Sequence, residues 1–274
     1  MFQAFPSEEL TDADTCAAGH RLKDVATRLV LLSGVLTWSC ASDLFARLAG
    51  SDDFLVRAAL GGMAASTLLL PFLLCVHPVF GRWRLRNPDL ILLSAAALLL
   101  PFVYVSTLGN PSLGTALPGK WLVAALALIL AASAEEIVFR LYFLDTLSFC
   151  GRSYIGIGLS SLLFAVAHSA NPGAGPLAVV NIGLFGVLLC LLRMASGGII
   201  APILVHYGWN LTTGMVLGWR VSGFQLPSVL SQRNPLWAGF GPESSPVLTV
   251  CLLALSWALA MGLDSDRRST EKSA

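Results

Sequence analysis

Long apolar segments constrain the fold of this chain more than any other feature of its sequence. An α-helix needs about 20 apolar residues to cross the hydrocarbon core of a bilayer. Only 12% of the residues are charged, about half of the share typical of a soluble domain, and in lipid only a helix satisfies its own backbone at these lengths. We therefore predict an all-α, polytopic transmembrane helix bundle of about eight spans, at about 27–46, 56–78, 89–108, 121–147, 154–170, 176–194, 199–218 and 246–263.

Polar ends and basic loops predict the organisation and orientation of this bundle. One transmembrane domain, 27–264, lies between a polar N-terminal tail, 1–26, and a polar C-terminal tail, 265–274. The densest basic cluster between spans is the loop GRWRLRN, residues 81–87, and Lys and Arg are enriched in cytoplasmic loops. We therefore expect a multi-pass protein of a bacterial-type inner membrane, with this loop and both tails in the cytoplasm.

Three charged residues interrupt the fourth predicted span near its middle, at Glu135, Glu136 and Arg140. A charge at the centre of a membrane helix costs at least about 2.5–3.5 kcal/mol on insertion scales. Residues four apart share a helix face, so Glu136 and Arg140 can form an ion pair that neutralises both and holds the helix in the bundle. Glu135 is turned about 100° away from that pair. Because a buried carboxylate without a partner is costly, Glu135 is the stronger functional candidate.

Two histidines also lie inside apolar spans. His168 is near the end of the fifth span, and His206 in the seventh span shares a helix face with Asn210, four residues later. Each of them alone is typical of a hydrogen-bonded contact between helices. Together with Glu135 they are the unpaired strong polar side chains of three separate spans. In one cavity within the bundle they would satisfy each other and hold a water molecule.

Three motifs, in this order, resemble those of the CPBP family of intramembrane proteases, which includes the CAAX-processing endopeptidase Rce1 and bacterial Abi-type proteins. The resemblance covers about 120–215, and each motif lies on its own predicted span. The motifs are Glu135-Glu136-x-x-x-Arg140, Phe164-x-x-x-His168 and His206-x-x-x-Asn210.

The resemblance implies an intramembrane endopeptidase with a catalytic cavity inside the bundle. Its substrate would be a membrane-associated protein or peptide in the lipid bilayer, processed at a CAAX-type end or a C-terminal sorting tail. Glu135 would be the activating carboxylate, and His168, His206 and Asn210 would complete the catalytic site. The supporting residues would be Glu136, Arg140 and Phe164.

Two chemistries are compatible with these residues. In the first, Glu135 acts as a general base on a water molecule that His168 holds. The oxyanion then accepts hydrogen bonds from His206 and Asn210, and such donors are worth about 3–4 kcal/mol each where they have been measured. In the second, Glu135, His168 and His206 bind zinc. The sequence assigns no cofactor with certainty, and we favour the metal-free glutamate mechanism.

Other functions also fit parts of the sequence. Intramembrane Glu and His residues form proton or ion relays in transporters, and a polar cluster can also join helices in a non-catalytic immunity or scaffolding protein. The longest connection, 219–245, is expected to be an ordinary extracytoplasmic loop rather than a substrate gate. The net charge of +1 gives no reason to expect nucleic acid as a partner.

Overall fold

The computed structural model describes residues 88–109, 111–114, 118–144, 153–232, 237 and 239–273. The predicted spans 27–46 and 56–78 lie outside these residues. The described part is mostly helical, which confirms the helical class. Its α-helices are α3 (Pro88–Leu108), α4 (Pro118–Glu136), α6 (Ser153–His168), α7 (Pro176–Ser196), α8 (Ile200–Asn210) and α9 (Pro246–Ser273). The shorter elements are the π-helices η2 (Ile137–Phe143) and η4 (Leu211–Val216), the 3-10 helix η5 (Pro242–Ser244) and the strands β1 (Ser112–Leu113) and β2 (Leu230–Ser231).

Three of the described helices are long and apolar enough to cross a membrane. They cover Gly119–Leu141, Pro176–Ser196 and Pro246–Asp264, while Leu92–Leu108 and Ser153–His168 are apolar but shorter. The predicted seventh span is divided between α8 and the π-helix that follows it directly, so it does not form one long α-helix. The described residues thus contain membrane-type helices, and the total of eight spans stays a prediction.

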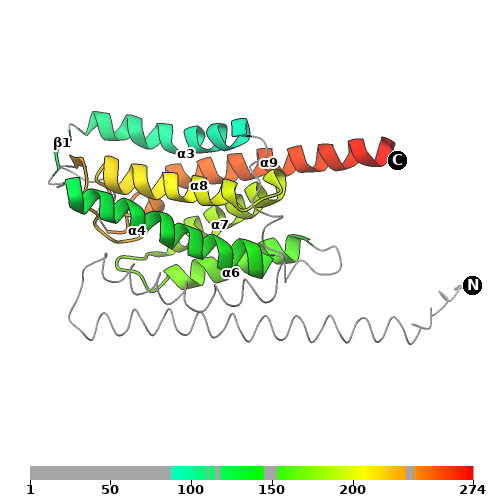
Figure 1. Ribbon diagram of the computed structural model, residues 1–274, viewed down its shortest axis with the longest axis horizontal. Helices are drawn as coiled ribbons and strands as arrows, with labels where there is room; N and C mark the ends of the chain where they lie inside the picture. The colour runs from blue at the N-terminus through cyan, green and yellow to red at the C-terminus, as the bar shows by residue number, and fades with distance from the viewer. Residues whose placement is uncertain are drawn as a thin grey trace, which may run out of the picture.

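The helix α7 is the centre of the described bundle. It packs against α6, α8 and α9, and α8 also contacts α3 and α4; Figure 1 shows these helices with their long axes roughly aligned and the C-terminal end of α9 projecting beyond the others. Of the apolar window of α7, 61% is buried, against 17% for α9. At Gly186 an added β-carbon would lie 3.1 Å from Ser161. This small residue lets α7 approach α6 closely, as in many membrane helix pairs.

The segment after η4 folds back over one end of the bundle. Strands β1 and β2 pair antiparallel, with Ser112 opposite Ser231. The amide of Gly223 donates to the carbonyl of Phe240, and a β-carbon added at Gly223 would lie 2.0 Å from the carbonyl oxygen of Pro172. The connection is therefore packed at Gly223 against the turn between α6 and α7.

Replacing Gly223 by Ala should destabilise this end of the bundle. Gly223 has a φ of +88°, and a strained backbone conformation costs about 1–3 kcal/mol before the clash is counted. We expect a lower midpoint of thermal unfolding in detergent for Gly223→Ala. The control is Gly208→Ala in α8, where an added β-carbon meets nothing within 4 Å and alanine should stabilise the helix by about 0.5–1 kcal/mol. Equal midpoints for the two variants would contradict the close packing at Gly223.

Candidate active site

The predicted ion pair between Glu136 and Arg140 is present and fully buried. Nη1 of Arg140 donates to Oε1 of Glu136 over 3.1 Å, and both side chains are 0% exposed. The guanidinium carbon also lies 4.2 Å from the centre of the Phe164 ring, which is the distance of a cation–π contact. The aromatic ring of the second motif therefore packs directly on the cation of the first.

Glu136 has a second partner that the sequence did not predict. Its Oε1 also accepts a hydrogen bond from Nδ1 of His206 over 2.8 Å, so one carboxylate oxygen joins α4 to α8. With Nδ1 donating, the neutral imidazole of His206 carries its free lone pair on Nε2. That atom lies 3.9 Å from Oε2 of Glu135. Glu136 thus orients the ring that faces Glu135.

His168 reaches the same carboxylate from α6. Its Nδ1 lies 2.8 Å from the carbonyl oxygen of Phe164, and since a carbonyl only accepts, Nδ1 donates. Its Nε2 is 3.7 Å from Oε2 of Glu135. A carboxylate oxygen and two unprotonated ring nitrogens are all acceptors, so a group that carries protons is needed between them. A water molecule is the simplest such group.

A π-helix follows this pair of carboxylates directly. The turns of η2 are wider than those of an α-helix, and π-helical turns occur frequently at functional sites. Here Ser160 of α6 donates its hydroxyl proton to the carbonyl of Phe139 over 2.6 Å. This bond fixes the widened turn to α6, the helix that carries His168.

The other predicted residues meet at a small cavity. His168, His206 and Asn210 line a space of about 10 Å³ together with Phe164 and Phe185, close to the volume that one water molecule needs. Glu135 does not belong to the lining of this cavity. It contacts the two imidazole rings from α4, with a side chain that is 35% exposed. The structure thus brings the four predicted catalytic residues together, with three at the cavity and Glu135 beside it.

Glu243, a residue that sequence reasoning missed, also lines the cavity. It is 3% exposed, and its Oε1 accepts hydrogen bonds from Nε1 of Trp209 over 3.2 Å and from the amide of Ser222 over 3.3 Å. Asn181 of α7 donates to the carbonyls of Glu243 and Ser245 and so fixes the η5 turn. In the sequence, Glu243 is one carboxylate in a polar loop, which gives no signal of burial. The connection 219–245 therefore contributes a buried carboxyl group to the cavity, and its role as an ordinary loop stays a prediction.

Burial raises the pKa of the Glu243 carboxyl from its ordinary 4.5 to about 7, although the hydrogen bonds from Trp209 and Ser222 oppose the shift. The folded protein then holds this proton more tightly than the unfolded chain. The resulting contribution to stability is present below pH 4.5 and is lost as the pH rises to about 7.

The pH dependence of stability should therefore change when Glu243 is replaced by Gln. Between about pH 4.5 and pH 7, the midpoint of thermal unfolding should fall more steeply for the native protein than for Glu243→Gln, because only the native protein carries this titrating group. The measurement is a series of thermal melts in detergent for both proteins. Parallel curves would show that Glu243 does not titrate in this range.

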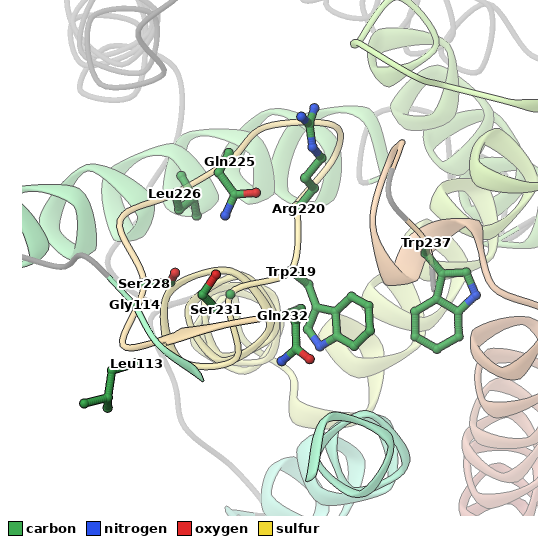
Figure 2. A pocket seen from close by; sticks show the side chains of 11 residues that line it. Leu113, Gly114, Trp219, Arg220, Gln225, Leu226, Ser228, Ser231, Gln232 and Trp237 are labelled. Atoms are coloured by element: carbon green, nitrogen blue, oxygen red, sulfur yellow. The ribbon is translucent and has the colours of Figure 1, made fainter. Parts of the chain in front are cut away.

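A second, larger cavity of about 300 Å³ is lined mostly by described residues of the connection 219–245. Figure 2 shows Arg220 and Gln225 on one side of it and Trp219 and Gln232 on the other. Neither histidine of the motifs lines it. Three of the four candidate catalytic residues, His168, His206 and Asn210, line the smaller cavity instead.

Metal binding does not emerge from the geometry of the described residues. Among residues 88–273, apart from the gaps given above, no group of three His, Cys, Asp or Glu side chains is arranged so that it could hold a metal ion. The zinc alternative through Glu135, His168 and His206 and the metal-free glutamate mechanism both stay predictions from the sequence. We derive no step through a metal.

Comparison with known proteins identifies the segment that carries the motifs. Residues 117–212 match the family model described as Rce1-like, type II CAAX prenyl endopeptidase. The chain carries an Rce1-like domain. This domain belongs to a protease family and, with the apolar helices, indicates an integral membrane protein. All three motifs fall inside the matched residues, and Glu243 falls outside them.

Two individual proteins are also similar to the chain. One is an uncharacterized 24.3 kDa protein of Escherichia coli, 29% identical over 171 residues, which cover 55% of this chain and 77% of that protein. The other is a probable potassium transport system protein Kup of Bordetella avium, 33% identical over 132 residues. That match covers 42% of this chain and only 20% of the Kup protein. No solved structure matches the chain significantly.

Proposed function

We propose that this protein is an intramembrane endopeptidase that hydrolyses a peptide bond of a membrane-associated protein with water activated by Glu135. The observation that carries this proposal is the convergence of Nε2 of His168 and Nε2 of His206 on one carboxylate oxygen, at 3.7 Å and 3.9 Å. A water held between Oε2 of Glu135 and Nε2 of His168 can donate one hydrogen bond to each of these acceptors and give up the proton that faces Glu135. The Rce1-like domain supplies the reaction class.

The first step of the proposed reaction is attack by water on the peptide carbonyl. Glu135 takes one proton of the water as general base, and His168 accepts a hydrogen bond from the other. The water oxygen forms a bond with the carbonyl carbon, and the carbonyl oxygen becomes an oxyanion. The buried, low-dielectric surroundings strengthen the electrostatic contacts of this site.

The second element is stabilisation of the oxyanion. Glu136 accepts from Nδ1 of His206, and a carboxylate in this position stabilises an imidazolium, as the aspartate does in serine-protease triads. For this role His206 takes a second proton from solvent on Nε2 before the reaction, donates it as a hydrogen bond to the oxyanion and keeps it throughout, and Asn210 donates from its amide. Each such donor is worth about 3–4 kcal/mol where measured.

The test is a comparison of protein termini in membranes that contain the protein and membranes that lack it. Mass spectrometry should find new termini that depend on the native protein and are missing with His168→Ala. Both preparations need equal amounts of folded protein, checked by thermal unfolding. Identical sets of termini in all membranes would rule out the proposed peptidase.

The substrate class follows from the family description, which names CAAX prenyl endopeptidases. We therefore propose processing at a CAAX-type end or at a similar C-terminal sorting tail. The purified protein should cleave a farnesylated peptide that ends in a CAAX sequence faster than the same peptide without the lipid. Equal rates would favour sorting tails or other membrane peptides over prenylated substrates.

One observation favours a transporter instead, namely the partial similarity to a protein named as a probable potassium transport system protein. The similarity spans a fifth of that protein's length, so it carries less weight than the motif geometry. Flux of potassium into liposomes that contain the purified chain distinguishes the two functions. A flux that depends on Glu135, without any cleavage, would favour transport.

A further inference from the structure

We propose that Glu243 is a second acid–base residue of this site, which delivers a proton through the cavity beside His206 and Asn210 to the amine that leaves the cleaved peptide. This inference rests on the proposed function, since it assigns the proton donor that peptide hydrolysis needs in addition to a general base. It also gives a direct role to the connection 219–245, which lies outside the Rce1-like match.

The geometry leaves one oxygen of Glu243 free for this role. Trp209 and the amide of Ser222 hold Oε1, whereas Oε2 is buried and makes no hydrogen bond within the described part of the chain. A buried polar atom of this kind calls for a partner. The cavity that Glu243 lines has about 10 Å³, so a single water can connect this oxygen to a group beside the histidines.

The backbone around Glu243 holds its carboxyl group in place. Gly241 has a φ of +107°, and an added β-carbon there would lie 1.9 Å from the carbonyl oxygen of Arg220 and 3.0 Å from Oε2 of Glu243. Only glycine fits this approach. Asn181, itself hydrogen-bonded by Thr249 over 2.7 Å, fixes the same turn from α7. Several elements therefore converge to place one carboxyl group at the cavity.

The proton transfers of the reaction balance with two carboxyl groups. The water oxygen bonds to the carbonyl carbon while Glu135 takes a water proton. The carbon–nitrogen bond then breaks, and the amine nitrogen takes a proton from Glu243, relayed by the water in the cavity. The cycle ends with Glu135 protonated and Glu243 ionised, and exchange with solvent water restores both.

The surroundings of the two carboxyl groups suit this division of roles. Glu135 is partly exposed, while burial raises the pKa of Glu243 to about 7, so that near neutral pH it retains a proton that it can donate. The titratable groups that face the same cavity are His206 from α8 and His168 from α6. A positive charge on His206 lowers the pKa of Glu243 and so promotes release of its proton. Pairs of acids in contrasting environments commonly divide the acid and base roles in this way.

The experiment compares Glu243→Gln with Ser244→Ala in the termini assay and across pH. Gln keeps the acceptor for Trp209 and Ser222 but does not donate an acid proton. We expect Glu243→Gln to fold normally and to lose cleavage by about 10²–10⁴-fold. Ser244 lies in the same turn and bonds only to the carbonyl of Gly241 among the described residues, so Ser244→Ala should cleave like the native protein.

The pH profile separates a proton donor from a structural anchor. Cleavage by the native protein should decline as the pH rises above about 7, because Glu243 loses the proton that it donates. The residual cleavage by Glu243→Gln should lack this decline. If Glu243→Gln cleaves at the native rate, or keeps the same decline, the inference is wrong while the proposed peptidase stands.

A spectroscopic readout tests the inference independently of cleavage. Infrared spectra of the native protein should contain a protonated-carboxyl band that disappears as the pH is raised through about 7 and that is missing in Glu243→Gln. If that band is the same in both proteins, Glu243 is not the acid. If the native protein itself cleaves nothing, the proposed function fails and this inference fails with it.

Discussion

Replacing Glu135 by Gln is expected to reduce cleavage by about 10²–10⁴-fold, the range that a general base contributes, while the fold stays intact. The amide has nearly the same size as the carboxylate but cannot take a proton from water. The side chain is 35% exposed, and its Oε2 makes no hydrogen bond within the described residues. Little stability should therefore be lost. The measurements are the yield of protein-dependent termini and the midpoint of thermal unfolding.

The neighbouring substitution Glu136→Gln is the matched control. Glu136 is fully buried between Arg140 and His206, so losing its charge leaves a buried guanidinium without its counter-charge. We expect Glu136→Gln to lower the midpoint of unfolding, whereas Glu135→Gln should not. If Glu135→Gln cleaves normally, Glu135 is not the base; if it unfolds as readily as Glu136→Gln, its role is structural.

Replacing Arg140 by Ala should have the largest effect on stability. Among the described residues, the guanidinium of Arg140 and the imidazole of His206 are the side chains that donate hydrogen bonds to Glu136. The guanidinium also packs on the Phe164 ring. Removing one partner of a buried ion pair costs about 3–5 kcal/mol, because the other charge stays buried. For a chain of this size that corresponds to a fall of roughly 10 °C in the midpoint.

A double variant distinguishes the cost of an orphaned charge from the loss of a contact. In Glu136→Gln with Arg140→Met, both charges are replaced by neutral side chains of similar length, a change that is often neutral for buried pairs. We expect the double variant to unfold at a higher temperature than Arg140→Ala. If the two unfold alike, packing on Phe164, and not the unpaired carboxylate, explains the loss.

The spacing of residues within a helix was the most informative part of the sequence. The separation of four residues between Glu136 and Arg140 predicted their ion pair, and the cost of polar groups in apolar spans predicted that His168 and His206 would meet near Glu135. These inferences succeed because helical geometry is local and because a membrane penalises unpaired polar groups strongly.

Contacts between side chains of different helices could not be predicted from the sequence and became visible only in the structure. The bond from His206 to Glu136 depends on how α8 packs against α4, and neither motif spacing nor hydropathy contains that distance. Glu243 was missed for a different reason: a carboxylate in a Gly- and Pro-rich connection has no apolar flanks to mark it as buried. The predicted seventh span is helical over 200–216, but η4 widens its second half to a π-helix, and local sequence did not indicate that change.

One oxygen atom of Glu136 accepts hydrogen bonds both from the Arg140 guanidinium, which neutralises its charge, and from the His206 imidazole, which faces Glu135. A substitution at Arg140 would therefore also disturb the carboxylate that orients the imidazole of His206. Improvements that spare activity should come from helices that carry none of the three motifs. Gly262 of α9 is one such position, because an added β-carbon there meets nothing within 4 Å.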